Sequence, residues 1–206
     1  MPSAIFKLRG LRAGGLAALA CAAALAVPAC ASDTPAPSST AATTQNETFE
    51  KNEIVQAVAT FFGVTAEAAG AAVEKIFSEY GRPSAYIKGE EASGAIGVGL
   101  RYGKGTLHMK GGTSETVYWQ GPSVGWDVGG NGAKCFTLVY NLPSPDYIYR
   151  RFPGVEGSAY FIGGIGVNYQ RDEKVTLAPM RAGVGFRLGA NVGYLSYTRK
   201  RHILPF

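Results

Sequence analysis

The chain has 206 residues, with 20 Lys and Arg against 15 Asp and Glu, and a formal net charge of +5. Three of the basic residues, Lys7, Arg9 and Arg12, belong to the first segment. Without these three, the 20 basic residues fall to 17 against 15 acidic ones, and the net charge falls to +2. So small an excess is not typical of a nucleic-acid-binding protein, and no nucleic-acid partner is expected.

Residues 1–31 have the three-part organisation of a secretory signal peptide. A basic start is followed by an apolar run from Leu16 to Val27, and then by Pro28 and small residues. The apolar run is shorter than the ~20 residues that a membrane-spanning helix needs. No later stretch is long and apolar enough, so the mature chain is expected to have no transmembrane segment and to reside in the periplasm.

The end of the signal has two interpretations. Ala29-Cys30-Ala31 fits cleavage after Ala31, which gives a mature chain that begins at Ser32. Val27-Pro28-Ala29-Cys30 resembles a lipobox, which predicts a lipid anchor on Cys30. In either case Cys135 is the remaining cysteine, and no internal disulfide is expected. Its apolar surroundings favour a buried apolar role over that of a nucleophile.

Residues 32–47 are rich in Ser, Thr, Pro and Ala and predict a disordered linker. Residues 48–82 then show two one-sided apolar stripes at helical spacing. Gly63 is a candidate cap for the end of the first helix, and Thr65 for the start of the second. We therefore expect a helical hairpin that packs on the domain that follows.

From residue 83 to residue 206 the apolar period changes to two, which is typical of β-strands. Gly103–Gly105 and Gly111-Gly112 are predicted to be turns, and Gly121-Pro122 is predicted to divide residues 117–130 into a central hairpin. Further strands are expected over 86–87, 94–102, 106–110, 134–141, 158–170, 174–180, 183–188 and 191–199.

Many of the 28 glycines stand inside these strands. Such repetition is explained by sharp coiling of strands or by close approach of another backbone. Closure also removes exposed sheet edges. The predicted fold is therefore mainly β, a small antiparallel β-barrel of about eight strands preceded by an N-terminal α-helical hairpin. An outer-membrane barrel is an alternative, but the charged end Arg199-Lys200-Arg201 argues against a last lipid-facing strand.

The segment from Pro143 to Gly154 is too long for a tight turn and predicts a short helix with an aromatic face. Two hypotheses follow for this segment: a lid over the barrel mouth, or a plug whose aromatic side chains complete the core. A small barrel can hold one apolar ligand. The candidate ligand-binding residues are Tyr118, Trp119, Trp126, Tyr147, Tyr149, Arg150 and Arg151. The competing hypothesis is a barrel filled by its own side chains.

No catalytic site is predicted. Gly121-Pro122-Ser123-Val124-Gly125 matches the nucleophile-elbow pattern, but that mechanism needs a helix after the serine, and a strand is expected there. The chain has two histidines, His108 and His202, which together with one cysteine cannot form a closed zinc site. No metal, cofactor or phosphate-binding loop is therefore expected.

Six motifs resemble the envelope integrity protein A (EipA) family of alphaproteobacteria. They are Gly89-Glu90-Glu91, GAIGVGLRYGKG over 94–105, YWQGPS over 118–123, LVYNL over 138–142, RFPGV over 151–155 and GANVGY over 189–194. The resemblance implies a periplasmic β-barrel that keeps the cell envelope intact, with no established enzymatic activity. Cys135 and the lipobox at Cys30 depart from what the family leads us to expect.

A weaker similarity, over about residues 94–140, is to SYLF lipid-binding domains, which share the turn Tyr102-Gly103-Lys104-Gly105. It favours a lipid-related role. The functional hypothesis is thus a non-enzymatic periplasmic protein that binds an apolar or amphipathic envelope component, a lipid for example, in the barrel. The alternative is a structural or protein-interaction module.

Overall fold

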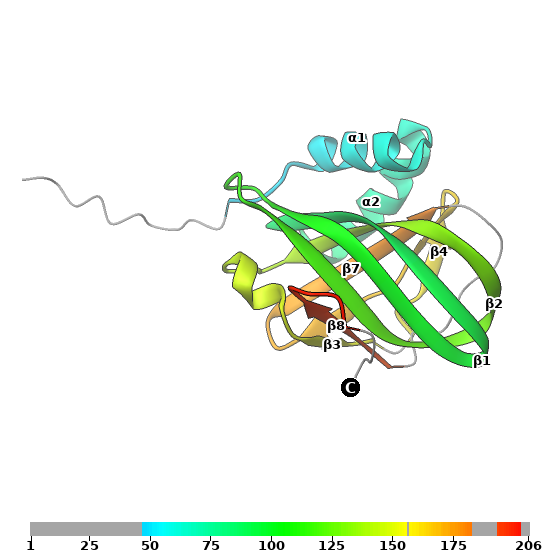
Figure 1. The fold of residues 1–206 in the computed structure, drawn as a ribbon. Coiled ribbons are helices and arrows are strands. Elements are labelled where there is room, and N and C mark those ends of the chain that lie inside the picture. The colour runs from blue at the N-terminus through cyan, green and yellow to red at the C-terminus, as the bar shows by residue number, and fades with distance from the viewer. Residues whose placement is uncertain (1–46, 156, 183–192, 203–206) are drawn as a thin grey trace, which may run out of the picture. The chain divides into compact units, whose positions relative to one another are not determined.

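The computed structural model describes residues 47–155, 157–182 and 193–202, with the backbone alone for 94–98 and 123–131 (Figure 1). The predicted signal peptide, almost all of the predicted linker and the predicted strand over 183–188 lie outside these residues. Within the described residues, no helix has the length and apolar character needed to cross a bilayer.

The two helices form where the apolar stripes predict them. Helix α1 spans Lys51–Phe62 and ends at Gly63, whose φ of 72° is the left-handed conformation that favours glycine. Helix α2 spans Ala66–Tyr80, and the Thr65 hydroxyl accepts a hydrogen bond of 3.3 Å from the backbone N–H of Ala68. Local capping chemistry therefore sets the boundary between the helices.

The sheet is dominated by one long antiparallel ribbon of strands β1, Ala85–Met109, and β2, Ser114–Tyr140 (Figure 1). The predicted turn at Gly103–Gly105 and the predicted hairpin at Gly121-Pro122 are wrong, because both segments lie inside these strands. Pro122 pairs in register with Leu100. Proline has no backbone N–H to donate to a neighbouring strand. It is tolerated at this position because the second edge of β2 pairs with β8 over residues 118–120 and with β7 over residues 135–140, and Pro122 lies between these two pairings.

Among the described residues, six shorter strands complete an eight-stranded sheet, and a short 3₁₀ helix lies between β2 and β3. Their bounds are η1 Pro145–Ile148, β3 Arg151–Pro153, β4 Tyr160–Ile162, β5 Ile165–Val167, β6 Gln170–Asp172, β7 Val175–Ala182 and β8 Tyr194–Thr198. The single strand predicted over 158–170 is wrong. Gly163 and Gly164, with φ of 60° and 81°, make a turn between β4 and β5.

The sheet curls because β2 takes part in it twice. One part of β2 pairs with β8, and β8 pairs with β3, while the other end of β2 pairs with β7, and β7 pairs with β6. An antiparallel bridge between Gly154 and Gln170 then joins the β3 side to the β6 side. The predicted fold class, a small antiparallel barrel preceded by a helical hairpin, is confirmed.

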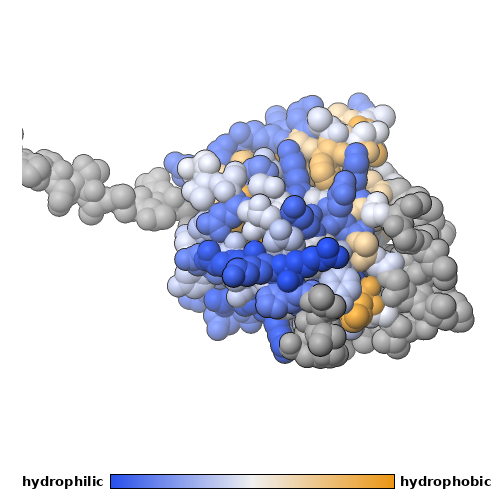
Figure 2. All heavy atoms as spheres, viewed as in Figure 1, coloured by the Kyte–Doolittle hydropathy of each residue, from blue (hydrophilic) through white to orange (hydrophobic). Residues whose placement is uncertain are grey.

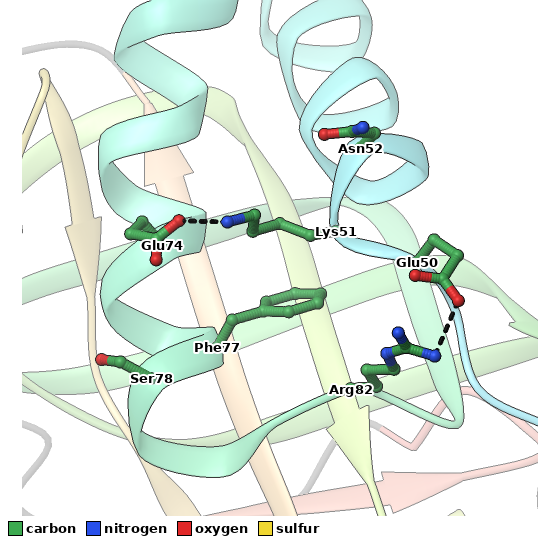
Figure 3. Close-up of a pocket in the computed structure, with 7 residues that line it drawn as sticks. All are labelled: Glu50, Lys51, Asn52, Glu74, Phe77, Ser78 and Arg82. Atoms are coloured by element: carbon green, nitrogen blue, oxygen red, sulfur yellow. Dashed lines mark hydrogen bonds and ion pairs between the residues drawn. The ribbon is translucent and has the colours of Figure 1, made fainter.

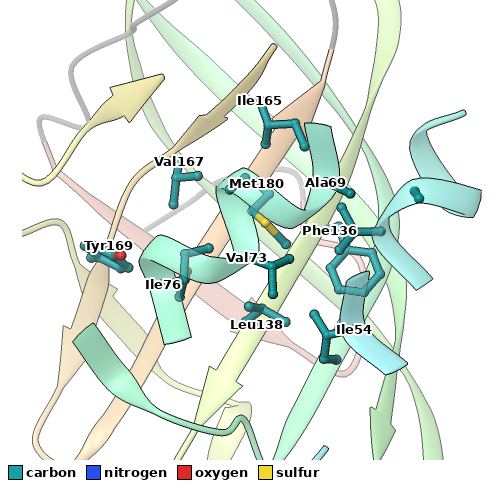
Figure 4. Close-up of a cluster of buried hydrophobic side chains, with 14 of the residues drawn as sticks. Ile54, Ala69, Val73, Ile76, Phe136, Leu138, Ile165, Val167, Tyr169 and Met180 are labelled. Carbon is teal, nitrogen blue, oxygen red and sulfur yellow. The ribbon is translucent and has the colours of Figure 1, made fainter. Parts of the chain in front are cut away.

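The two faces of the curled sheet bury two different cores. Alternation along β2 sends Cys135 and Val139 into the inner core, and Phe136 and Leu138 to the outer face. The outer face is covered by the helices, and Figure 4 shows Val73 of α2 over the sheet residues. The inner core consists of Ala85, Ile87, Leu107, Val117, Trp119, Cys135, Val139, Leu142, Ile148, Phe152, Val175, Leu177, Leu195 and Tyr197.

Glycine lets the two halves of β1 meet backbone to backbone. A Cβ atom on Gly89 would lie 2.7 Å from the Cα atom of Gly105 and 2.7 Å from the Trp119 ring. No side chain fits there. The close approach brings the start and the end of β1 together, and Glu91 and Arg101 lie 3.2 Å apart there.

Candidate functional site

A cluster of charged side chains lies at one end of the barrel interior. Glu91 and Arg101 come from β1, and Arg181 comes from β7, all on the inward-facing parity of their strands. Arg181 binds both carboxylate oxygens of Glu91, from Nε at 2.9 Å and from Nη2 at 3.0 Å. The Nε atom of Arg101 lies 3.2 Å from Glu91 Oε1. Only 5% of the Glu91 side chain is exposed.

Two neighbours complete the cluster. The indole N–H of Trp119 donates a hydrogen bond of 2.9 Å to Oε2 of Glu91. The Nη1 atom of Arg181 donates a hydrogen bond of 2.8 Å to Oδ1 of Asn168. Two guanidinium groups and one indole N–H therefore surround a single carboxylate, and both of its oxygens are engaged.

The electrostatics keep this cluster ionised. Burial by itself raises the pKa of the Glu91 carboxyl. The positive charges of Arg181 and Arg101 lower this pKa by more than burial raises it, so that its value in the folded protein is about 2. Burial lowers the pKa of Arg181, and the Glu91 carboxylate more than offsets it, so the net shift is upward. One negative and two positive charges thus persist in the protein interior.

The Cys135 thiol lies beside the cluster but has no sign of activation. Its residue is 2% exposed, and Sγ is 3.7 Å from the hydroxyl oxygen of Thr137. Burial raises the pKa of the thiol, which outweighs the influence of Arg181. A protonated, enclosed thiol is a poor nucleophile, and this geometry is that of a core residue.

A cavity of about 270 Å³ opens over the cluster. Trp119 belongs to both, because the residue is part of the cavity lining and its indole N–H binds Glu91. The Lys104 ammonium lies 5.8 Å from the centre of the Tyr118 ring at this cavity. The lining residues are Glu90, Glu91, Ala92, Tyr102, Gly103, Lys104, Tyr118, Trp119, Gln120, Gly132, Arg201 and His202.

Two of the seven candidate ligand-binding residues, Tyr118 and Trp119, therefore line this cavity. The side chain of Trp126 lies outside the described residues. Tyr147, Tyr149, Arg150 and Arg151 lie elsewhere, in or next to η1 and β3, and none of the four lines the cavity.

Three of these four residues are engaged with other protein groups, whereas Tyr147 is 47% exposed and has the Arg150 guanidinium 5.4 Å from the centre of its ring. The Tyr149 hydroxyl donates a hydrogen bond of 2.8 Å to Glu115, and Arg150 forms an ion pair of 2.9 Å with Asp172. The Arg151 guanidinium lies 5.0 Å from the centre of the Tyr194 ring. Of the two hypotheses for this segment, lid or plug, the buried Ile148 of η1 in the inner core shows that it contributes to the core.

Sequence reasoning missed Glu91, Arg101, Arg181 and the cavity residues Lys104 and Arg201. Strand parity did not point to Arg101, because the apolar residues Leu100 and Tyr102 lie on the other face of the strand, and in the structure Leu100 is 36% exposed. Arg181, the partner of Glu91, is 90 residues from it, and no local pattern connects them.

At the exposed end of the β1–β2 hairpin, a histidine and a serine lie within hydrogen-bond distance of each other. His108 Nδ1 is 3.0 Å from the hydroxyl oxygen of Ser114, its cross-strand partner. A nucleophilic serine also needs a group that orients the histidine. Among the described residues no carboxylate is hydrogen-bonded to His108, whose ring lies 5.0 Å from that of Tyr86. Ser123 lies inside β2, without the helix that a nucleophile elbow needs.

Metal binding finds no support in the part of the chain that the structure describes, where no three His, Cys, Asp or Glu residues are grouped to hold an ion. A second cavity, of about 500 Å³, lies between the start of α1 and the end of α2 (Figure 3). Its charges neutralise one another through the ion pairs Lys51–Glu74 and Arg82–Glu50, at 2.6 and 2.7 Å. This groove therefore has no charge preference of its own.

The structure defines a class of protein, a small β-barrel domain with a helical hairpin packed on its outer face and a charged cluster at one end of its interior. The chain belongs to the Envelope integrity protein A family, whose profile matches residues 47–206. The resemblance seen in the sequence motifs is thereby confirmed.

A solved structure shows the same fold. It is the crystal structure of a beta-barrel-like, uncharacterized protein from Brucella abortus. That protein is 46% identical to this chain, the match covers 77% of this chain and 99% of the other, and the TM-score is 0.70. The comparison with curated proteins returns no match.

Proposed function

We propose that this protein is exported to the periplasm and supports the integrity of the cell envelope without catalysing a reaction, by binding an amphipathic envelope component at the cavity beside Trp119. The family to which it belongs supports the envelope role. The N-terminal segment, with its basic start, apolar run and small-residue cleavage region, supports export.

The observation that carries the binding role is the cavity itself. Its lining combines the aromatic residues Tyr118 and Trp119 with polar and charged residues, and sites for amphipathic molecules have this composition. The barrel interior below it is filled, since Leu107, Phe152 and Leu177 are fully buried there among their neighbours. We therefore place the ligand at the mouth of the barrel and not inside it.

The absence of catalysis is supported by the state of the reactive groups. Glu91 is ionised and fully hydrogen-bonded, so it is poorly suited to proton transfer. Cys135 is enclosed and protonated. A binding module needs neither group to react, and both instead fill and order the barrel.

A second candidate function is a structural or protein-interaction module. The filled interior favours it, and so does Phe161 on β4, which is 64% exposed. Exposed aromatic side chains often anchor protein partners. The outer-membrane alternative is less well supported, because the coloured surface over the described part of the ribbon in Figure 2 is mainly hydrophilic.

Native mass spectrometry of the protein purified from the envelope fraction tests the proposal. An additional mass that is lost on denaturation is expected, and Tyr118→Ser should remove it while circular dichroism remains unchanged. The matched control is Phe161→Ser, which changes an exposed aromatic residue that does not line the cavity. If the bare polypeptide mass persists after incubation with envelope lipid extracts, the binding role is wrong.

The same two variants separate the candidate functions in cells. A strain that lacks the protein and is complemented with Tyr118→Ser should remain sensitive to detergent, whereas complementation with Phe161→Ser should restore resistance. The opposite pattern would favour the protein-interaction module.

A further inference from the structure

The groove between the start of α1 and the end of α2 contains an aromatic ring that lies between two ion pairs. Figure 3 shows the ring of Phe77 between the pair Lys51–Glu74 and the pair Arg82–Glu50. The groove has a volume of about 500 Å³, which lies within the range of roughly 300–1,000 Å³ for small-molecule sites. A small polar molecule therefore fits over the ring, with charged groups on either side of it.

The charges that line this groove are balanced. Lys51 and Arg82 supply the positive charges, and Glu50 and Glu74 supply the negative ones. The two helix ends beside the groove also have opposite signs, because α1 begins there and α2 ends there. A ligand with a charge of one sign only would meet repulsion as well as attraction. A ligand that carries both charges can place each of them next to its opposite.

Both ion pairs are open to exchange with such a ligand. The side chains of Lys51 and Glu74 are 48% and 63% exposed, and those of Arg82 and Glu50 are 58% and 57% exposed. Exposed ion pairs contribute little to stability, because water already solvates both partners. A ligand that supplies the counter-charge can therefore replace one partner at small cost, and the fold does not depend on either pair.

Glu74 and Arg82 recognise different chemical groups. The guanidinium of Arg82 is a planar fork of donors that fits the oxygens of a phosphate or a carboxylate. The carboxylate of Glu74 attracts an ammonium group, and the face of an aromatic ring such as that of Phe77 attracts the same group. Because Phe77 lies between Glu74 and Arg82 in Figure 3, the groove has an end for a cation and an end for an anion.

From this arrangement we infer that the groove is a zwitterion site, which binds an ammonium group at Glu74 and Phe77 and a phosphate or carboxylate group at Arg82. The site is separate from the cavity beside Trp119, since the two share no lining residue, and it does not depend on ligand binding there. The two charges belong either to the head group of a zwitterionic lipid or to a free zwitterion.

An NMR titration of the isotopically labelled processed protein measures binding through the backbone amide signals of residues 51–52 and 77–82. The probes are glycerophosphocholine, which carries one charge of each sign, choline, which carries the cation alone, and glycerol 3-phosphate, which carries the anion alone. Glycerophosphocholine is expected to bind at least roughly tenfold more tightly than either of the other two, because it satisfies both ends of the groove. If choline or glycerol 3-phosphate binds as tightly, recognition of both charges is wrong.

Phosphatidylcholine vesicles distinguish the two sources of the ligand. If the protein sediments with the vesicles and glycerophosphocholine releases it, the site takes a lipid head group. If glycerophosphocholine binds and the vesicles do not retain the protein, the site takes a free zwitterion.

Variants assign each charge of the ligand to one end of the groove. Glu74→Gln and Arg82→Gln should each lose roughly tenfold or more of the affinity for glycerophosphocholine. Glu74→Gln should weaken the binding of choline and not that of glycerol 3-phosphate, and Arg82→Gln should do the reverse. The matched controls are Glu67→Gln and Lys174→Gln, which change exposed charges that do not line the groove, and both should bind as the unchanged protein does.

Circular dichroism of the variants should match that of the unchanged protein, because all four altered side chains are exposed. An unchanged affinity in both Glu74→Gln and Arg82→Gln would overturn the inference, and so would an equal loss in the two control variants. If none of the three probes binds, the zwitterion site is wrong. The proposed function would not fall with it, because the mass spectrometry described above tests the other cavity.

Discussion

The indole N–H of Trp119 and the carboxylate of Glu91 are joined by a hydrogen bond of 2.9 Å that links the barrel interior to the cavity at its mouth. Trp119 is 2% exposed and Glu91 5% exposed, so the bond is shielded from water. Because Trp119 lines the cavity and donates to the Glu91 carboxylate, the ionisation of Glu91 affects the position of Trp119 beside the cavity. Disturbing the cluster should therefore affect both stability and the cavity.

Replacing Glu91 by Gln should destabilise the fold strongly. The substitution keeps the shape of the side chain but leaves Arg101 and Arg181 without their shared counter-charge. Removing one partner of a buried ion pair costs about 3–5 kcal/mol of unfolding free energy. Urea denaturation measures this loss. The control is Glu90→Gln, which removes the same charge from an adjacent exposed residue, and a similar loss in both variants would contradict the assigned role of the cluster.

The stability of the protein should depend on pH through Glu91. Its pKa is lowered from an ordinary value of 4.5 to about 2 in the folded protein. A lowered carboxyl pKa contributes stability above the unfolded pKa, and this stability is lost as pH falls through the folded pKa. The contribution is of the order of 3 kcal/mol at neutral pH, and it should disappear between about pH 4.5 and pH 2.

Urea midpoints recorded across this range for the unchanged protein and for Glu91→Gln provide the measurement. The difference between the two should narrow as the pH falls. A difference that stays constant from pH 7 to pH 2 would show that Glu91 does not titrate as the structure requires.

Gly89→Ala should destabilise the barrel, because the added methyl group meets the backbone of Gly105 and the ring of Trp119, each at 2.7 Å. Overpacking of a closed site costs about 1–3 kcal/mol. Gly111→Ala is the matched control, since a Cβ there has nothing within 4 Å. The midpoint of thermal unfolding checks both, and an unchanged midpoint for Gly89→Ala would mean that the two halves of β1 do not meet as described.

Cys135 should resist modification in the native protein. Burial raises the pKa of its thiol, and the side chain is enclosed, so neither thiolate formation nor access favours reaction. With the protein lacking residues 1–31, the reaction of Cys135 with an aromatic disulfide reagent should be far slower before than after denaturation. Comparable rates in the two states would place the thiol at the surface.

The sequence by itself determined the helical hairpin and the β character of the remainder. Helical boundaries depend on neighbours a few residues apart, so the stripe from Ile54 to Val58, the left-handed Gly63 and the Thr65 cap were sufficient. The two-residue period likewise separated the two faces of the strand, with Arg101 on one and Leu100 and Tyr102 on the other, but it did not show which face is buried. These patterns involve residues close together in the sequence, and the helices and strands that they predict are present in the folded structure.

Only the tertiary structure decided where the strands bend and which charged residues meet. The turns predicted from Gly103–Gly105 and Gly121-Pro122 were wrong, because a glycine in a strand permits either a turn or close backbone contact, and only packing selects between them. Glu91 and Arg181 meet because β2 pairs with both β1 and β7. Strand pairing of this kind is a non-local interaction, and its free energy comes from burial that no single segment encodes.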